Sequence, residues 1–468
     1  MRSASSRFTC LRVAGMDGVL FQNENDVSRR GRKWRPCPGY RIRTVVMNNG
    51  ERLPMLLGRA DGVPLFGPTV YALTQVRGRS RSAAAIECHL RAIMHLLVFS
   101  EAESIKLDER IVSGRLLVMC ELDALAAATR LPLETLVERS SQFKNGAILP
   151  KTESQQTSLE NYRANLSAKV LPSVVADSAG TRLRVIRDYV KWLANRQIGK
   201  LADDAEIIFR RTTLDAFVTG INARIPSNQG RGDRPLPEGL PQERIERIRK
   251  IIEPDNPDNP WKDLSVRIRN KLIVQCLDQI GIRRGELLAI RVCDLKGHSS
   301  EVNIVRRPDS LEDPRVRQPL VKTRGRMLPI SNLFLLAQSY VLDIRLKIKG
   351  ATKHPYLFVC ARRGRPLSHS GLTKVFRTLS AALGFDVAAH LLRHSWNDSF
   401  SAEMDRKKVP EATEKKVRSY LQGWKETSGT AATYTRRHTR EQAGKILIQM
   451  QEDVFNMGKV KLNESEKC

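Results

Sequence analysis

A stretch rich in proline and glycine divides this chain and most constrains what it can fold into. Residues 224–239, RIPSNQGRGDRPLPEG, contain three prolines, three glycines and few apolar side chains. Proline and glycine interrupt helices and strands, and a segment with few apolar groups adds little to a core. We therefore interpret 224–239 as a linker, because the 468 residues suffice for roughly two to four domains.

The region 66–223 is predicted to be a helical domain. Apolar residues recur at helical spacing within 84–99, at Ile86, Leu90, Ile93 and Leu97. A second amphipathic helix is predicted over 181–196, with an apolar stripe of Leu183, Ile186, Val190 and Leu193. Its cations, Arg182, Arg184, Arg187 and Lys191, lie mostly elsewhere on the helix. They either contact a nucleic-acid backbone or form a solvated basic face.

The remaining segments complete a fold class that is mainly α with a small antiparallel sheet. Residues 1–65, with a β-like run at 41–47, are interpreted as a β-containing basic extension or as a poorly ordered basic segment. Helices are expected over 240–295 and again up to 455. Strands are expected at 301–307, 317–323 and 326–330, a loop at 151–158, and a polar, lysine-rich tail at 456–468.

The charge of the chain indicates a polyanionic partner. Its 79 Lys and Arg against 50 Asp and Glu give a net charge of +29. Lys and Arg contacts to phosphate release counterions, so nucleic acid is the favoured partner. The sequence contains no run of about 18 apolar residues, so it does not predict a membrane-spanning segment. An RNA-binding protein is disfavoured, because only 6% of residues are aromatic and no stacking motif is present. A merely basic soluble protein is the alternative.

The cysteines do not suggest disulfides or a metal site. The eight are Cys10, Cys37, Cys88, Cys120, Cys276, Cys293, Cys360 and Cys468. None form a CxxC pair and no nearby histidine gives metal-ligand spacing. Reduced, buried thiols in a cytosolic protein are the better interpretation. The first 21 residues lack the continuous apolar core of a secretory signal.

Four islands between 281 and 438 carry residues suited to phosphate chemistry. In GIRRGELLAIRVCDL (281–295), Arg283 follows a glycine turn, and Glu286 three residues later can orient a guanidinium. In VKTRGRMLPI (321–330), Lys322 lies on the tip of a predicted hairpin. Considered alone, the first island is most simply interpreted as an ordinary capped helix, and Lys322 as a solvated lysine.

The other two islands add an imidazole, an indole and a phenol. In HLLRHSW (390–396), His390 and Arg393 share one helical face, whereas His394 is expected to point elsewhere and to be structural. In 419–438, Trp424 offers an indole N–H. Tyr434 follows ten residues later between two threonines, with arginines after it.

In this order the four islands resemble the catalytic domain of the tyrosine recombinases, the family of the phage integrases, over roughly 236–445. The GxRxxEL and HxxRH boxes carry the resemblance. Residue by residue it implies a catalytic set of Arg283, Lys322, His390, Arg393, Trp424 and Tyr434. Trp424 stands where many members have histidine, and Tyr420 precedes it and fits poorly as the nucleophile. The resemblance makes 240–455 the catalytic domain and 66–223 the helical core-binding domain.

The resemblance implies an integrase or transposase of a mobile element, which cleaves and rejoins DNA through a 3′-phosphotyrosyl intermediate. The covalent link conserves the bond energy, so no cofactor or metal is needed. A type IB topoisomerase and a catalytically silent DNA-binding relative are the alternatives. The first would share the chemistry without exchanging strands, and the second would need only the cations.

The same resemblance implies the partners. Two domains joined at 224–239 would form a C-shaped clamp around double-stranded DNA. The predicted helix 441–455 has an apolar stripe, and we expect it to dock on a neighbouring protomer in a homo-tetramer, with packing on its own domain as the alternative. Accessory DNA-bending proteins or a partner recombinase are compatible with this scheme. The expected location is the bacterial cytoplasm, at the nucleoid.

Overall fold

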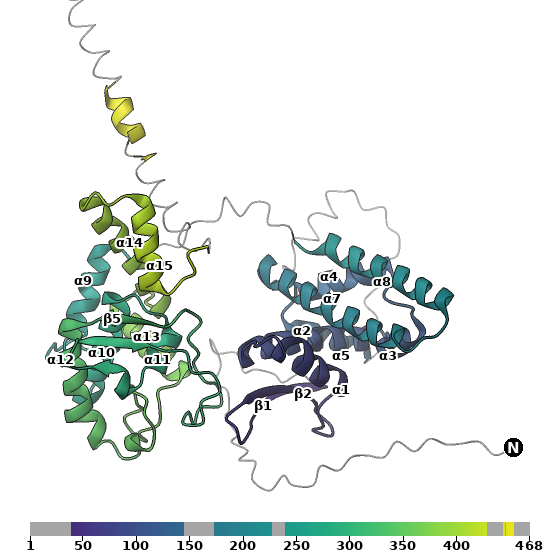
Figure 1. Cartoon of the computed structure of the whole chain (residues 1–468), viewed down its shortest axis with the longest axis horizontal. Coiled ribbons are helices and arrows are strands. Elements are labelled where there is room, and N and C mark those ends of the chain that lie inside the picture. The colour runs from purple at the N-terminus through teal and green to yellow at the C-terminus, as the bar shows by residue number, and fades with distance from the viewer. Residues whose placement is uncertain (1–38, 145–172, 227–238, 428–442, 445, 454–468) are drawn as a thin grey trace, which may run out of the picture. The chain divides into compact units, whose positions relative to one another are not determined.

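The computed structural model describes residues 39–144, 173–226, 239–427, 443–444 and 446–453 (Figure 1). It divides into two compact units. Unit 1 comprises Met1–Met47 and Arg52–Asn228, and unit 2 comprises Asn48–Glu51 and Gln229–Cys468. The C-shaped clamp, which concerns the arrangement of the two units, stays a prediction.

Unit 1 is a helical bundle with one β-hairpin on it. The hairpin pairs β1 (Tyr40–Val46) with β2 (Arg52–Gly58) in antiparallel register. The helices are α1 (Phe66–Tyr71), the π-helix η1 (Ala72–Arg77), α2 (Ala83–Ala102), α3 (Leu107–Ser113), α4 (Met119–Thr129), α5 (Leu133–Lys144), α7 (Ala176–Ile198) and α8 (Asp204–Arg224). The helices predicted within 84–99 and 181–196 are therefore confirmed, each as part of a longer helix.

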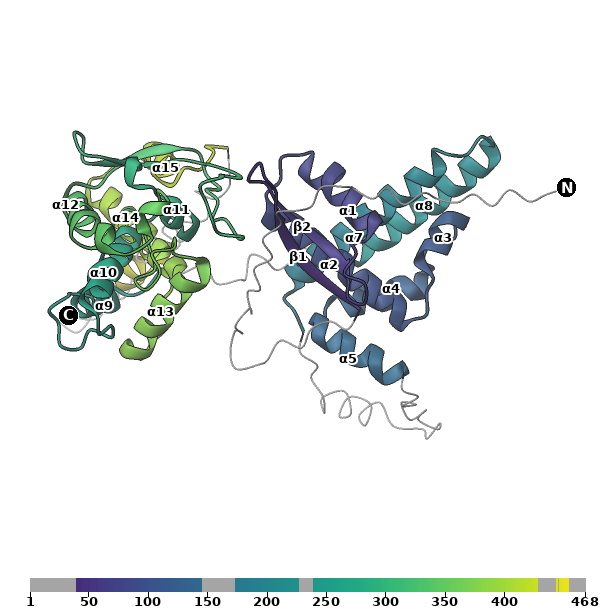
Figure 2. The same cartoon turned by 90° about the horizontal axis from the view of Figure 1, so that it is seen from below.

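Helix α2 forms the centre of this unit. Ser82 caps its N-terminus, and Ile86, Leu90 and Ile93 are fully buried. The helix contacts α5, α7 and both strands of the hairpin (Figure 2). It is also, among the described residues, the one helix long and apolar enough to cross a membrane by length and composition. Its many buried residues are those of a core helix.

Helix α7 has the amphipathic character that its sequence predicts. Its predicted stripe is buried at three positions and half-buried at Leu193. Two of its cations have partners within the unit, because Arg182 donates to the carbonyls of Thr129 and Leu131, and Arg187 pairs with Asp188. Arg184 and Lys191 are exposed.

Unit 2 surrounds a three-stranded antiparallel sheet with helices. The strand order is β3 (Leu295–Lys296), β4 (Glu301–Ile304) and β5 (Arg326–Pro329). The α-helices are α9 (Gln242–Ile251), α10 (Leu264–Gln279), α11 (Arg284–Ala289), α12 (Ser331–Ser339), α13 (His369–Leu383), α14 (Ala389–Arg406) and α15 (Glu411–Gln422). Short helices lie at η3 (Val292–Asp294), η4 (Tyr340–Ile344), η5 (Arg345–Lys347) and η6 (Ala351–Lys353). The described residues thus confirm a mainly α fold with small antiparallel sheets.

The strand predicted at 317–323 is wrong. This segment has no strand structure, and Lys322 lies in an irregular connection rather than on a two-stranded hairpin. Pro319 has no N–H to donate to a ladder. The connection is instead held by side chains, since the Gln318 amide donates to the carbonyl of Arg307 at 2.9 Å.

Residues 443–444 and 446–453 are helical, as predicted for this part of the chain. Their large apolar side chains, Ile446, Leu447, Ile448 and Met450, are all more than half exposed. Ile446, Leu447 and Met450, which belong to the predicted stripe, are therefore exposed in the part of the chain that the structure describes. The predicted loop at 151–158 and tail at 456–468 lie outside the described residues.

Candidate active site

Arg283 projects from the turn between α10 and α11. Gly281 turns the chain at φ +59°, a conformation that favours glycine. Arg283 is the N-cap residue of α11, and its backbone N–H donates to the Glu286 carboxylate at 2.9 Å. The Arg283 guanidinium lies 3.7 Å from the same carboxylate and donates to the Gln422 carbonyl at 3.3 Å. Glu286 therefore orients Arg283 mainly through the backbone.

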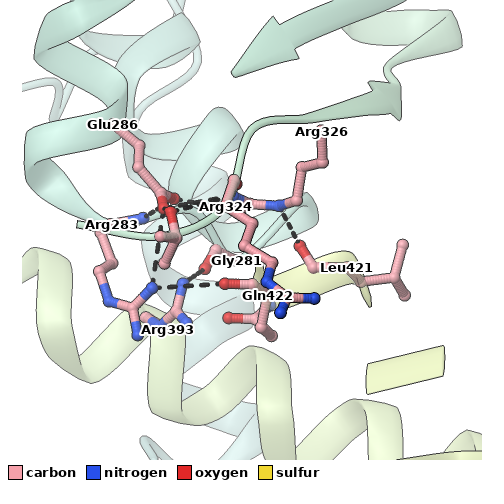
Figure 3. A network of polar contacts seen from close by, with 9 residues as sticks. Gly281, Arg283, Glu286, Arg324, Arg326, Arg393, Leu421 and Gln422 are labelled. Carbon is pink, nitrogen blue, oxygen red and sulfur yellow. Dashed lines mark hydrogen bonds and ion pairs between the residues drawn. The ribbon is translucent and has the colours of Figure 1, made fainter. Parts of the chain in front are cut away.

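Arg393 reaches the same turn from α14. Its side chain is nearly fully buried, and Nη1 donates to the carbonyl of Gly281 at 2.6 Å. The guanidinium also lies 5.5 Å from the centre of the Trp424 ring, within the range of a cation–π contact. Arg283 and Arg393 are thus both anchored around the Gly281 turn (Figure 3).

The expectation that His394 points away from His390 is wrong. The Nε2 atoms of the two rings lie 2.8 Å apart, and the ring centres are 4.1 Å apart. Residues four apart on a helix are neighbours, which explains the contact. Burial, followed by the charges of Arg393, Arg283 and Arg284, lowers the pKa of His390 below its ordinary value. A neutral imidazole at neutral pH can accept a proton.

Lys322 is exposed at the start of a segment whose other residues are tied to the site. The next residue, Thr323, donates its hydroxyl to Glu286. Arg326 opens β5 and forms a buried ion pair with Glu286 at 3.1 Å. Lys322 is therefore an exposed side chain next to residues that are hydrogen-bonded to Glu286.

The C-terminal end of α15 is the meeting point of these segments. Its last carbonyls have no partner within the helix and need outside donors. Those of Leu421, Gln422 and Gly423 accept, respectively, from Arg326 Nε at 2.6 Å, Arg283 Nη1 at 3.3 Å and the backbone N–H of Arg324 at 3.0 Å. Figure 3 shows the first two of these bonds. Cations at a helix C-terminus also interact favourably with its dipole.

Trp424 directly follows this helix end and is largely buried. Gly423 makes the turn at φ +64°, and the Trp424 N–H donates to the carbonyl of Ser419 at 2.8 Å. The indole is thus held against Arg393 by a C-cap that requires glycine.

Tyr434 lies outside the described residues, so its placement stays a prediction. Tyr420, the less suitable tyrosine, is exposed, and its hydroxyl lies 3.5 Å from the carbonyl of Met327. Among the described residues no group of three or more His, Cys, Asp or Glu side chains could hold a metal ion. The expectation of buried thiols is correct for Cys276 but wrong for the other described cysteines, Cys88, Cys120, Cys293 and Cys360, which are exposed.

Sequence reasoning missed Arg326, and it did not foresee how closely Gly281 and Gly423 are packed. A signal for Arg326 exists, since Arg326 and Leu328 alternate on the buried face of β5. An arginine on an apolar strand face indicates a buried ion pair. The glycines gave a weaker signal, because the side chains around them come from distant parts of the sequence, such as Trp396 at Gly281 and Arg326 at Gly423.

Comparisons with known proteins find similarity to integrases, transposases and recombinases. Residues 240–442 match the model of the phage integrase family. Transposase A from transposon Tn554 of Staphylococcus aureus is 25% identical over 132 residues, which are 27% of this chain and 34% of that protein. Tyrosine recombinase XerC of Vibrio atlanticus is 24% identical over 221 residues, 44% of this chain and 62% of that protein. The part of the transposase that the chain matches is thus 34% of its length.

Solved structures similar to the chain include two complexes with DNA. The XerH site-specific recombinase bound to its difH substrate is 18% identical, with a TM-score of 0.39 over 71% of this chain and 85% of that one. The Tn1549 transposon integrase with circular intermediate DNA is 15% identical, with a TM-score of 0.34 over 68% of this chain and 95% of that one.

A small antiparallel sheet enclosed by helices carries two anchored arginines near one turn, and paired guanidinium groups are chemically suited to an anion. Residues 240–442 are thus similar to the phage integrase family, and the relatives of the chain include tyrosine recombinases.

Proposed function

We propose that the protein is a site-specific DNA recombinase, an integrase or transposase of a mobile element, that cleaves and rejoins DNA through a 3′-phosphotyrosyl intermediate. The observation that carries this proposal is the anchoring of two neighbouring guanidinium groups, that of Arg283 on the Gln422 carbonyl and that of Arg393 on the Gly281 carbonyl. Two guanidinium groups fixed in this way suit the nonbridging oxygens of a single phosphodiester. The family match and the transposase and recombinase relatives support the same reaction.

In the cleavage step, the hydroxyl oxygen of Tyr434 attacks the scissile phosphorus. A bond forms between that oxygen and phosphorus, and the bond from phosphorus to the 5′-oxygen breaks. The phenol proton passes to His390, and the leaving 5′-oxygen takes a proton from Lys322. The 5′-hydroxyl of a partner strand reverses the step and restores the phosphodiester. Bond energy is conserved, so the scheme needs neither ATP nor a metal ion.

The cations act on the transition state. Negative charge increases on the nonbridging oxygens as phosphorus gains its fifth neighbour, and Arg283 and Arg393 oppose it from fixed positions. Trp424 packs on Arg393 and supplies a neutral donor in place of a second histidine. Losing one clamp donor should slow cleavage by roughly 10²–10³-fold, the range found for comparable oxyanion-site donors.

Double-stranded DNA is the proposed partner. The net charge of +29 is the electrostatic footprint of a protein that binds a phosphate backbone. Exchange between two duplexes needs four cleavages, and hence four protomers. The exposed apolar residues of 446–450 support docking of this helix on a neighbouring protomer. We place the protein in the bacterial cytoplasm at the nucleoid, with accessory or partner recombinase proteins as further components.

A covalent-trapping experiment tests the activity. DNA linked to the full-length protein in cells is isolated and sequenced to find the site. A nicked oligonucleotide of that sequence then loses the fragment with the 5′-hydroxyl after cleavage, which traps the adduct. Wild type should form a protein–DNA adduct, and Tyr434→Phe should form none. Absence of a wild-type adduct would favour the silent DNA-binding alternative. Relaxation of supercoiled DNA without strand exchange would favour the topoisomerase alternative.

A further inference from the structure

Arg326 is buried behind the two clamp arginines, and its side chain is only 1% exposed. It donates Nη2 to Glu286 Oε2 at 3.1 Å and Nη1 to Glu286 Oε1 at 3.3 Å. Its Nε donates to the carbonyl of Leu421 at 2.6 Å. Figure 3 shows this side chain spanning the distance between Glu286 and the end of α15. Arg326 thus connects three separate segments of the site.

Glu286 is the acidic side chain at the centre of this network, and it is fully buried. Burial alone would raise the pKa of its carboxyl. The charge of Arg326, with hydrogen bonds from Arg326, Thr323 and the Arg283 N–H, instead holds that pKa below its ordinary value. Glu286 is therefore a carboxylate, and its negative charge lies 3.7 Å from Nη1 of Arg283.

Because of this proximity, the Glu286 carboxylate and the scissile phosphate would compete for the guanidinium of Arg283. A buried carboxylate attracts any cation within reach, because an uncompensated charge in the interior is costly. The Arg283 guanidinium is within reach and is also the group that the scissile phosphate needs. The geometry resolves the conflict, since Arg326 takes both carboxylate oxygens and leaves Arg283 at the longer distance.

We propose that Arg326 is a positioning residue, which neutralises Glu286 so that the charge of Arg283 serves the scissile phosphate. The inference rests on the proposed recombinase function. Arg326 touches neither DNA nor the reacting atoms in this scheme. It acts through Arg283, and through the Leu421 carbonyl it fixes the helix end against which Arg283 is also held.

The dependence of the cleavage rate on the charge of the scissile phosphate distinguishes this role from a merely structural one, which would slow charged and neutral substrates equally. Cleavage is measured in single turnover on the nicked substrate, once with the ordinary phosphate and once with a neutral methylphosphonate at the scissile position. Arg326→Met should slow cleavage of the phosphate by roughly 10²–10³-fold, as for a lost clamp donor. The loss on the methylphosphonate should be under about 10-fold, because that substrate has no nonbridging charge for Arg283 to oppose.

The chain offers a matched control in Arg315, which forms a buried ion pair with Asp313 at 2.8 Å in the same unit. Arg315→Met should lower stability but slow both substrates equally. The double variant Glu286→Gln/Arg326→Met removes both charges, and it should recover at least about 10-fold of the phosphate rate lost in Arg326→Met, since a neutral side chain no longer competes for Arg283.

Each outcome decides between the two roles. Equal losses of Arg326→Met on the two substrates, or no recovery in the double variant, would overturn the proposal. If Arg326→Met fails to fold, Arg326→Lys and the double variant carry the test. Arg326→Lys keeps the charge, so it should retain the wild-type ratio between the two substrates, and a changed ratio would count against the idea. A wild type without any adduct would refute the recombinase function itself, before these variants are compared.

Discussion

Replacing Gly423 by alanine should damage both the fold and the site, for separable reasons. Gly423 ends α15 at φ +64°, and a left-handed residue with a Cβ costs about 1–2 kcal/mol. The added Cβ would also lie 2.7 Å from Nη1 of Arg326, 2.8 Å from Cβ of Thr323 and 3.0 Å from the carbonyl oxygen of Arg324. Relieving such overpacking typically costs a further ~1–3 kcal/mol.

Gly384 is the matched control for this substitution. It ends α13 in the same conformation, at φ +75°, and a Cβ there would meet nothing within 4 Å. Gly384→Ala should therefore cost only the backbone part, about 1–2 kcal/mol. The difference between the two variants in free energy of unfolding isolates the collision with the Arg326 segment.

Urea unfolding and single-turnover cleavage of the nicked substrate measure the two effects. A shift of about 1 Å at Arg326 or Trp424 should slow cleavage by roughly 10²-fold in Gly423→Ala, whereas Gly384→Ala should stay within about 3-fold of wild type, because it is far from these contacts. Equal stabilities for the two variants would refute the packing argument. Equal cleavage rates would refute the importance of this contact for catalysis.

Four further results are expected. In the DNA-free protein, the ring of His390 should titrate below pH 6.5, because burial and neighbouring arginines lower its pKa. The measurement is an NMR titration in which the His390 signals are assigned by comparison with His390→Asn. A midpoint above pH 6.5 would contradict the lowered pKa. Burial, with a smaller effect of Arg182, lowers the pKa of His95 to about 3. Neutral, buried His95 stabilises the fold fully above pH 6.5, and this stabilisation is lost as the pH falls toward 3. Between pH 7 and pH 5 the free energy of unfolding of wild type should therefore fall by about 2 kcal/mol more than that of His95→Gln, as measured by urea unfolding. Identical pH profiles for the two proteins would contradict the lowered pKa of His95. Lys322→Ala should slow cleavage by roughly 10²–10⁴-fold. A substrate with sulfur in place of the 5′-bridging oxygen should remove most of this defect, because a thiolate leaves without taking up a proton. A defect of the same size on both substrates would contradict the role of Lys322 as the acid. Leu447→Glu should leave unfolding unchanged but reduce tetramers on DNA in analytical ultracentrifugation, since Leu447 is exposed; unchanged assembly favours a different interface.

The helices of this protein were predictable because local periodicity encodes them. The stripe over 181–196 and the run within 84–99 each give three buried positions in the structure. The strand at 317–323 failed for a reason visible in the sequence, since Pro319 interrupts it. The hairpin of β1 and β2 was seen as β-like at 41–47, but its packing on α2 depends on residues far away in the chain and could not be predicted.

The site was predictable to the extent that its chemistry is written in local boxes. The boxes placed Arg283 and Glu286 on one turn and His390 and Arg393 on one helix, as the structure has them. The partner of Glu286 was missed because the two residues are 40 positions apart, and a sequence read alone favours the arginine three residues away. His394 was misjudged although the signal was local, since residues four apart on a helix are neighbours and the two rings are in contact.

The end of α15 determines where the segment that leads to Tyr434 begins. Helix α15 is fixed on α14 by the fully buried Arg418, which bonds to Ser401 at 2.5 Å and to Glu414. Its last carbonyls are then held by donors from α11 and from the 324–326 segment. Loss of any one donor leaves a buried carbonyl unsatisfied, at a cost of about 1–3 kcal/mol. One network thus positions the arginines of the proposed clamp and the end of α15, after which the chain continues toward the proposed nucleophile.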